Sequence, residues 1–150
     1  MTASIENKAP ATSGQLATFR LDGDLYGIEV EHVQEVLRSQ QLTRVPLAPT
    51  AVAGLINLRG QVVTAIELRE RLGRPPRPAG TDAVVIVVRL HGEAVSLLVD
   101  SIADVVDVDA ADFEAPPDTL EGQARELIRG AYKLRGQLLL ALDVHKAVSA

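Results

Sequence analysis

GLINLRGQVVTAIELRERL, residues 54–72, is repeated as GAYKLRGQLLLALDVHKAV at residues 130–148. Aligned without a gap, the two segments are identical at Gly54/Gly130, Leu58/Leu134, Arg59/Arg135, Gly60/Gly136, Gln61/Gln137 and Ala65/Ala141. Most remaining pairs exchange one apolar residue for another, and Glu67 is matched by Asp143. A match of this length inside one chain indicates a structural unit that is used twice.

A second pair of segments repeats upstream in the same order. FRLDGDLYGIEVEHVQEVL, residues 19–37, is matched by VRLHGEAVSLLVDSIADVV at residues 88–106. Two matches in the same order predict two copies of one folding unit. Because a unit of about 60 to 70 residues is marginally stable alone, we expect the copies to share part of their core. The boundary between them is the natural place for a partner to bind.

Stretches that alternate apolar and polar residues predict short strands in both units. Asp22-Gly23 predicts a type I′ hairpin turn, and turns are also expected at Arg59-Gly60, His91-Gly92 and Arg135-Gly136. Short helical segments are predicted at residues 31–37, 67–72 and 143–148. The expected fold is therefore mainly β, with two tandem barrels that are filled by aliphatic side chains.

The repeat also predicts where the chain divides. Residues 1–14 are small and polar and are expected to form a disordered tail. Residues 15–80 should form the first lobe and residues 81–150 the second, with GRPPRPAG at residues 73–80 as the linker. The C-terminal segment is a candidate to pack across both lobes.

Composition excludes several classes of function. The 150 residues include no Cys and no Trp, so disulfides and thiolate chemistry are ruled out. With a net charge of -5 and no basic stripe, nucleic-acid binding is not expected. No secretory signal and no apolar run of membrane-spanning length is visible, which predicts an intracellular protein without direct membrane insertion.

Residues that carry catalytic chemistry are scarce, and the prediction is that the protein is not an enzyme. His32, His91 and His145 show none of the spacings of metal sites and are expected to be solvated surface residues. The acidic stretch at residues 100–114 lacks the ligand order of a calcium loop, so a solvated acidic face is favoured. A metal-dependent hydrolase built on this stretch stays open as the weakest hypothesis. No catalytic residue, metal site or cofactor is predicted.

Binding is the remaining kind of function. Arg59 and Arg135 lie in tight turns, where a guanidinium can offer its planar set of donors to a partner, or can simply be tolerated. In VQEVL, residues 33–37, Val33 and Val36 bracket two polar residues. An aliphatic patch with a polar rim is typical of an interface, but core packing explains the same pattern equally well.

Three stretches together resemble a known family. LYGIEVEHVQEVL (residues 25–37), TRVPLAPTAVAGLINLRGQVVTAIELRERLG (residues 43–73) and VVIVVRLHGEAVSLLVDSIADVVDV (residues 84–108) are similar to the CheW family of bacterial chemotaxis coupling proteins. The similarity runs from about residue 15 to the C-terminus. It implies a single CheW-like domain made of two SH3-like five-stranded barrels with short connecting and C-terminal helices. The family pattern has Pro and Asp where this chain has Thr64 and Glu67.

The resemblance implies a non-catalytic adaptor in the cytoplasm that is recruited to membrane-associated receptor arrays. Its implied partners are the cytoplasmic helical tip of a chemoreceptor, the regulatory domain of a CheA-type histidine kinase and other copies in a ring. A coupling module of a non-chemotaxis phosphorelay, which controls motility, development or a second messenger, is the alternative. The expected protein-binding residues are Val33, Gln34, Glu35, Val36, Asn57, Arg59 and Gly60.

Overall fold

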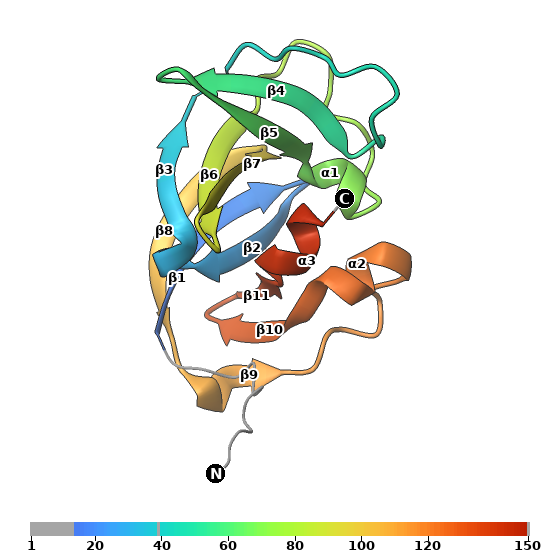
Figure 1. Ribbon diagram of the computed structural model, residues 1–150. Helices are drawn as coiled ribbons and strands as arrows, with labels where there is room; N and C mark the ends of the chain where they lie inside the picture. The colour runs from blue at the N-terminus through green and yellow to red at the C-terminus, as the bar shows by residue number, and fades with distance from the viewer. Residues whose placement is uncertain (1–13, 39, 150) are drawn as a thin grey trace.

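The computed structural model describes residues 14–38 and 40–149. Strands dominate, and a few short helices lie among them (Figure 1). The predicted tail, residues 1–14, lies almost wholly outside the described residues. The elements in chain order are β1 (Gly14–Leu21), β2 (Asp24–Glu29), η2 (Val30–His32), β3 (Val33–Leu37), β4 (Val52–Leu58), β5 (Gln61–Glu67), α1 (Leu68–Arg71), β6 (Val84–Leu90), β7 (Glu93–Val99), β8 (Ser101–Val108), η3 (Ala110–Asp112), β9 (Phe113–Glu114), α2 (Gly122–Leu127), β10 (Ile128–Leu134), β11 (Gln137–Leu142) and α3 (Val144–Val148).

The strands form two sheets. Sheet A has six strands in the order β8-β1-β2-β11-β10-β9, and sheet B has five in the order β3-β6-β7-β5-β4. Neighbours are antiparallel except β11 with β2 and β5 with β7, which are parallel. In Figure 1 sheet B occupies the upper half of the molecule and sheet A the lower half, with α1 and α3 between them. The mainly β class with two SH3-like barrels is thus confirmed.

The two sheets are built to one plan, but the N-terminal hairpins are exchanged between the two halves of the chain. Hairpin β1-β2 joins strands of the second half in sheet A, whereas β6-β7 joins strands of the first half in sheet B. The division into residues 15–80 and 81–150 therefore does not describe the two sheets. A repeated sequence fixes which segments are equivalent, but not which copy each segment pairs with.

The hairpin turns follow the prediction closely. Asp22, Arg59 and His91 all have positive φ, of 51°, 49° and 51°, and each is followed by a glycine with φ above 80°. Two positive φ values in succession define the type I′ turn, which matches the twist of the flanking strands. The short helices after β5 and β11 are also present, as α1 and α3.

The helix predicted over residues 31–37 is wrong. Only Val30–His32 is helical, as a single 3-10 turn, and VQEVL forms strand β3 on the edge of sheet B. Five residues are too few for a 3.6-residue period to be told from alternation, and valine favours a strand. Pairing with β6 satisfies the backbone groups on one side of β3, with a register shift between Val33 and Glu35.

Three apolar clusters fill the molecule. Sheet B encloses one around Ile56, Val63 and Val87, and sheet A encloses another around Leu16 and Leu139. The largest cluster draws on both sheets and on the helices, so the predicted shared core is present. It includes Phe19, Tyr26, Ile28, Ile66, Leu68, Ile86, Leu97, Leu142 and Val144.

Candidate protein-interaction site

Strand β3 and the β4-β5 turn meet through one ion pair. The Arg59 guanidinium lies against the Glu35 carboxylate, with 2.9 Å between Nη1 and Oε2 and a second contact between Nη2 and Oε1. Because β3 and β4 are the two outer strands of sheet B, this pair joins the open edges of the sheet. The hydrogen bonds from Arg59 lower the pKa of Glu35, and those same bonds raise the pKa of Arg59.

The turn that presents Arg59 is held by its neighbours. The Gly60 N–H donates to Oδ1 of Asn57 at 3.0 Å, which closes the turn with a side-chain acceptor. Gly60 itself has φ 85°, a conformation that glycine adopts without steric cost. Asn57 and Gly60 therefore support Arg59, whose side chain is 69% exposed.

Side chains of β3 alternate between two environments. Val33, Glu35 and Leu37 are half-buried, and Val33 packs against the large central core. Gln34 and Val36 point to solvent, and Val36 is 43% exposed. Gln34 accepts a hydrogen bond from Nε of Arg89 at 2.8 Å. The predicted residues thus lie close together, but Val33 belongs to the core.

The equivalent turn in sheet A differs. Arg135 is exposed like Arg59, yet within the described residues no carboxylate forms an ion pair with it. The position equivalent to Glu35 is Asp104, which is also exposed. The repeated arginine is therefore ordered by an acidic partner in only one of the two copies.

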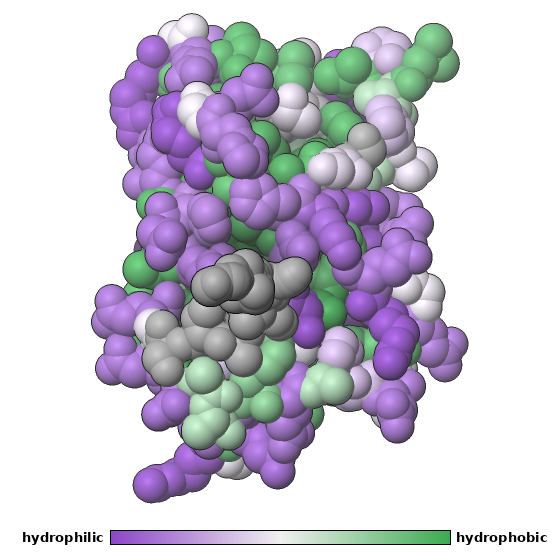
Figure 2. All heavy atoms as spheres, turned by 60° about the horizontal axis from the view of Figure 1, so that its bottom comes forward, coloured by the Kyte–Doolittle hydropathy of each residue, from purple (hydrophilic) through white to green (hydrophobic). Residues whose placement is uncertain are grey.

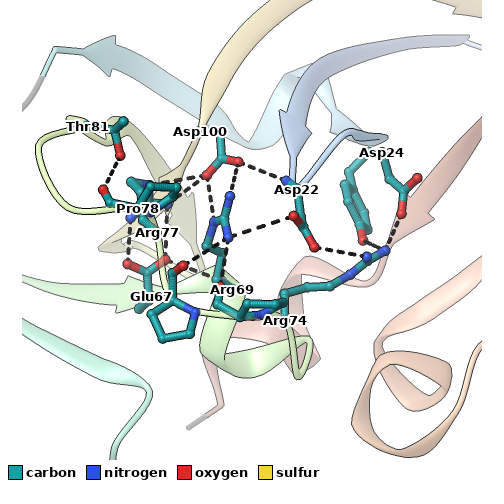
Figure 3. Close-up of polar contacts among 12 residues, drawn as sticks. Asp22, Asp24, Glu67, Arg69, Arg74, Arg77, Pro78, Thr81 and Asp100 are labelled. Atoms are coloured by element: carbon teal, nitrogen blue, oxygen red, sulfur yellow. Dashed lines mark hydrogen bonds and ion pairs between the residues drawn. The ribbon is translucent and has the colours of Figure 1, made fainter.

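A second polar group, which sequence reasoning missed, lies where the two sheets meet (Figure 3). We call Arg69, Asp100, Asp22, Arg77 and Glu67 the charged junction. Arg69 is only 6% exposed and binds Asp100 through Nε and Nη2, at 2.9 and 2.6 Å. Asp100 also accepts from the Asp22 N–H at 2.8 Å, so α1 is joined to the β1-β2 turn of sheet A.

The proline-rich loop, residues 73–80, takes part in this junction. The α1 helix ends with bonds from the Gly73 N–H to the Glu70 carbonyl, 3.2 Å, and from the Arg74 N–H to the Arg69 carbonyl, 2.8 Å. This pairing is a Schellman motif, with Gly73 at φ 71°. The loop was predicted as a linker, and its ends do connect α1 to β6, but it also packs against both sheets.

Two arginines of the loop bind acidic groups on either side. Arg77 donates from Nη1 to Oε1 of Glu67 at 2.8 Å and from Nε to Oδ1 of Asp100 at 3.2 Å. Arg74 contacts the Asp24 carboxylate and, at 3.1 Å, the Tyr26 hydroxyl. Glu67 also caps α1 by accepting from the Arg69 N–H at 3.3 Å, so it serves in two contacts.

These contacts change the acidity of Asp100. Partial burial alone would raise the pKa of Asp100, but hydrogen bonds from Arg69 and the Asp22 N–H, with the charges of Arg69 and Arg77, lower it to about 2. The carboxylate is therefore ionised at neutral pH. Arg69, which is buried, has a counter-ion throughout the physiological range.

The acidic stretch at residues 100–114 offers little support for a metal-dependent enzyme. Its first member, Asp100, is occupied by Arg69 and Arg77. As the side chains stand in residues 14–38 and 40–149, no three His, Cys, Asp or Glu are placed to hold a metal ion. No helix in this part of the chain is long and apolar enough to cross a membrane.

Figure 2 shows the molecule turned so that the bottom of Figure 1 comes forward. The surface on this side is mainly hydrophilic, with small groups of hydrophobic atoms among the hydrophilic ones. Large apolar side chains that are more than a third exposed occur on several strands and in the segment between β3 and β4. Val36 on β3 and Val105 on β8 occupy equivalent places in the two copies, at 43% and 53% exposure. The exposed strands β3 and β8 are therefore matched candidates for contact with other proteins.

Comparison with known proteins agrees with this architecture. The CheW-like domain family matches residues 15–150, and the chain belongs to that family. The chemotaxis protein CheW of Treponema pallidum is 31% identical over 140 residues, covering 91% of this chain and 82% of the relative. CheW of Klebsiella aerogenes is 30% identical over 149 residues, covering 99% and 90%.

Comparison with solved structures also finds a CheW protein. The crystal structure of the scaffolding protein TtCheW from Thermoanaerobacter tengcongensis matches with a TM-score of 0.81 at 27% identity, covering 93% of this chain and 94% of that chain. The CheW family and this structural neighbour are scaffolding proteins that are generally not catalytic. A further relative, PilI of Pseudomonas aeruginosa, is 29% identical over 129 residues, covering 85% of this chain and 71% of PilI.

Proposed function

We propose that this protein is a non-catalytic adaptor that couples transmembrane chemoreceptors to a CheA-type histidine kinase. The observation that carries the proposal is the surface formed by β3 and the Arg59 turn, in a chain of the CheW-like family. On that surface the Arg59 guanidinium is held by Glu35, and the two neighbours of Glu35 along β3, Gln34 and Val36, are exposed. No reaction is assigned to the protein, and its output is the contact between two partners.

The receptor side of the proposal uses Gln34, Glu35, Val36 and Arg59. Val36 offers apolar area, while Arg59 offers donors that Glu35 does not occupy. An amphipathic helix such as the tip of a receptor presents both chemistries along one face. Asn57 and Gly60 act indirectly by shaping the turn, and Val33 acts by packing β3 against the core.

The kinase side is assigned to the regulatory domain of the kinase, which the family resemblance describes as having the same double-barrel fold. Association of further copies into rings, and recruitment of a cytoplasmic protein to membrane-associated arrays, belong to the same proposal. Repeated weak contacts suit such an array, so each contact is expected to have a Kd on the order of micromolar.

A matched pair of substitutions tests the receptor surface. Arg59→Ala removes the guanidinium in the β4-β5 turn, which contacts β3. Arg135→Ala removes the equivalent guanidinium in the β10-β11 turn of sheet A. We expect Arg59→Ala to weaken binding to a soluble receptor signalling fragment at least about tenfold, as for loss of a well-placed charged contact. Arg135→Ala should bind as the wild type does. Equal binding by the wild type and both folded variants would refute the surface assignment.

The relative PilI supports a second candidate function, because it is not named a chemotaxis protein. In this alternative the chain serves a phosphorelay that controls motility, development or a second messenger. Affinity capture of the protein from its own cells, followed by identification of the histidine kinase that accompanies it, separates the two. A kinase that operates with chemoreceptors supports the first, and one without them supports the second.

A further inference from the structure

All three histidines of the chain meet at one place, although the sequence separates them widely. His32 ends η2, His91 lies in the β6-β7 turn and His145 lies in α3. The ring centroids of His32 and His145 are 5.4 Å apart, and those of His91 and His145 are 5.2 Å apart. The histidines were expected to be solvated surface residues, and His91 and His145 are indeed exposed while His32 is half-buried, but nothing in the sequence indicated that the three lie together. We call these residues the histidine cluster.

The histidine cluster occupies the place that mirrors the charged junction. In the two aligned repeats, His145 stands where the first copy has Arg69, and His91 stands where it has Asp22. Arg69 and Asp22 approach each other at 4.0 Å and help to join α1 to the β1-β2 turn. At the equivalent contact between α3 and the β6-β7 turn, two imidazoles replace the ion pair.

The spacings of His32 and of His91 from His145 each fit two ligands of a shared metal ion. For a tetrahedral ion with metal–nitrogen bonds of about 2.0 to 2.1 Å, the centroids of two imidazole ligands lie about 5 Å apart. As the side chains stand, no three His, Cys, Asp or Glu in the described part of the chain are placed to hold a metal ion, so the rings have to turn to form the site. His91 and His145 are exposed, so their rings can turn about the side-chain torsions without moving core residues.

The Glu29 carboxylate lies beside one ring nitrogen of His32. Its Oε1 lies 3.4 Å from Nε2 of His32, and 3.5 Å from Nη1 of Arg129. A carboxylate on one ring nitrogen fixes the tautomer and leaves the other nitrogen, here Nδ1, as the metal ligand. His32 is also the least exposed of the three, with 22% of its side chain accessible.

We propose that His32, His91 and His145 form a binding site for a divalent transition metal ion of the imidazole-binding class, with Zn²⁺ as the reference ion. Nitrogen-only ligands favour Zn²⁺, Ni²⁺ and Cu²⁺ over Mg²⁺ and Ca²⁺, which require oxygen. The bound ion joins η2, the β6-β7 turn and α3, and so ties sheet B to the helix that follows sheet A. Glu29 is a positioning residue for His32.

Titration of the purified full chain with ZnCl₂ by isothermal calorimetry tests the proposal. We expect one ion per chain and a rise in Tm that saturates at the same stoichiometry, because an ion that binds only the folded state stabilises it. MgCl₂ should give neither effect. Absence of Zn²⁺ binding, or binding of several equivalent ions, would overturn the proposal.

Single substitutions then locate the site. His145→Gln and His91→Gln should each weaken Zn²⁺ binding by at least about tenfold, and Glu29→Gln by about 10-fold or more through its effect on His32. Lys146→Gln, on the neighbouring exposed position of α3, is the matched control and should bind as the wild type does. Undiminished binding by His145→Gln, with its Tm in the absence of metal unchanged, would show that the ion lies elsewhere.

Co²⁺ provides a readout that does not depend on affinity. Intense visible absorption bands are expected for Co²⁺ in a four-coordinate site, and these bands should disappear in His91→Gln. A spectrum equal to that of hydrated Co²⁺ would contradict the site. Because these measurements use the isolated protein, their failure leaves the adaptor proposal unaffected.

Discussion

Arg69 and Asp100 form a bidentate ion pair at the place where the chain passes from sheet B to sheet A. Nε–Oδ1 is 2.9 Å and Nη2–Oδ2 is 2.6 Å, and the side chain of Asp100 is 24% exposed. The same carboxylate receives the Asp22 N–H from the β1-β2 turn. The relative placement of the two sheets therefore depends on a charge network in addition to the shared apolar core.

Asp100→Asn should destabilise the protein by about 2 kcal/mol, because a nearly buried guanidinium then lacks its counter-ion. Urea unfolding at pH 7 measures the change. Asp107→Asn is the matched control on β8, since Asp107 is exposed, and it should stay within about 0.5 kcal/mol of the wild type. Equal stabilities of the two variants would mean that Arg69 is satisfied without Asp100.

Stability should depend on pH below about 4 through Asp100. Its pKa is about 2 in the folded state against an ordinary value of 3.8, so the folded state holds the proton less tightly than the unfolded state. The contribution is present above pH 4 and is lost as pH falls toward 2. With allowance for solvent screening it amounts to about 1 to 2 kcal/mol. Urea midpoints from pH 5 to pH 2 should fall less steeply in Asp100→Asn than in the wild type.

Gly54 and Gly130, which are equivalent in the two repeats, are required for close backbone approach. A Cβ on Gly54 would lie 2.6 Å from the Thr43 carbonyl oxygen, and one on Gly130 would lie 2.5 Å from the Glu114 carbonyl oxygen and 2.4 Å from Cζ of Phe113. Gly130→Ala should therefore destabilise by about 1 to 3 kcal/mol, and Gly54→Ala similarly.

Gly27→Ala is the comparison for these glycines, because its Cβ would meet only side-chain atoms, the nearest being Cδ1 of Leu139 at 3.0 Å. A flexible side chain can yield where a backbone carbonyl cannot, so the loss of stability should be smaller. Thermal unfolding of the three variants gives the order. A larger loss in Gly27→Ala than in Gly130→Ala would contradict this explanation.

Substitutions on strand β3 should distinguish an effect on stability from an effect on receptor binding. Val33→Ala removes methyl groups that pack against the core and should cost about 1 kcal/mol in the free energy of unfolding, whereas Val36→Ala should change it by less than about 0.5 kcal/mol. Only Val36→Ala should reduce receptor binding without loss of stability. If Val36→Ala binds normally, the outer face of β3 is not the contact surface.

The fold could largely be predicted from the sequence, because turn chemistry and internal repetition act locally. Asp22-Gly23 and Arg59-Gly60 specify turns whatever lies around them. The exchange of hairpins could not be predicted, since both arrangements satisfy the same alternation of residues. Strand β3 was mistaken for a helix because its short pattern fits both periods and pairing with β6 decides between them.

The predicted contact residues were brought together by the fold, but their separate roles were not visible in the sequence. That Val33 packs inward while Val36 faces solvent follows from the strand period. The charged junction and the histidine cluster were missed because their members are distant along the chain. Superposing the two repeats pairs Arg69 with His145 and Asp22 with His91, and this correspondence is the one signal in the sequence that relates the two places.

The most direct test of the adaptor function is the activity of a CheA-type kinase mixed with receptor signalling fragments, with and without this protein. We predict that kinase autophosphorylation rises only when all three components are present, that Arg59→Ala reduces the rise, and that Arg135→Ala preserves it. Kinase activity that is the same with and without the protein, although each component is folded, would contradict the adaptor function.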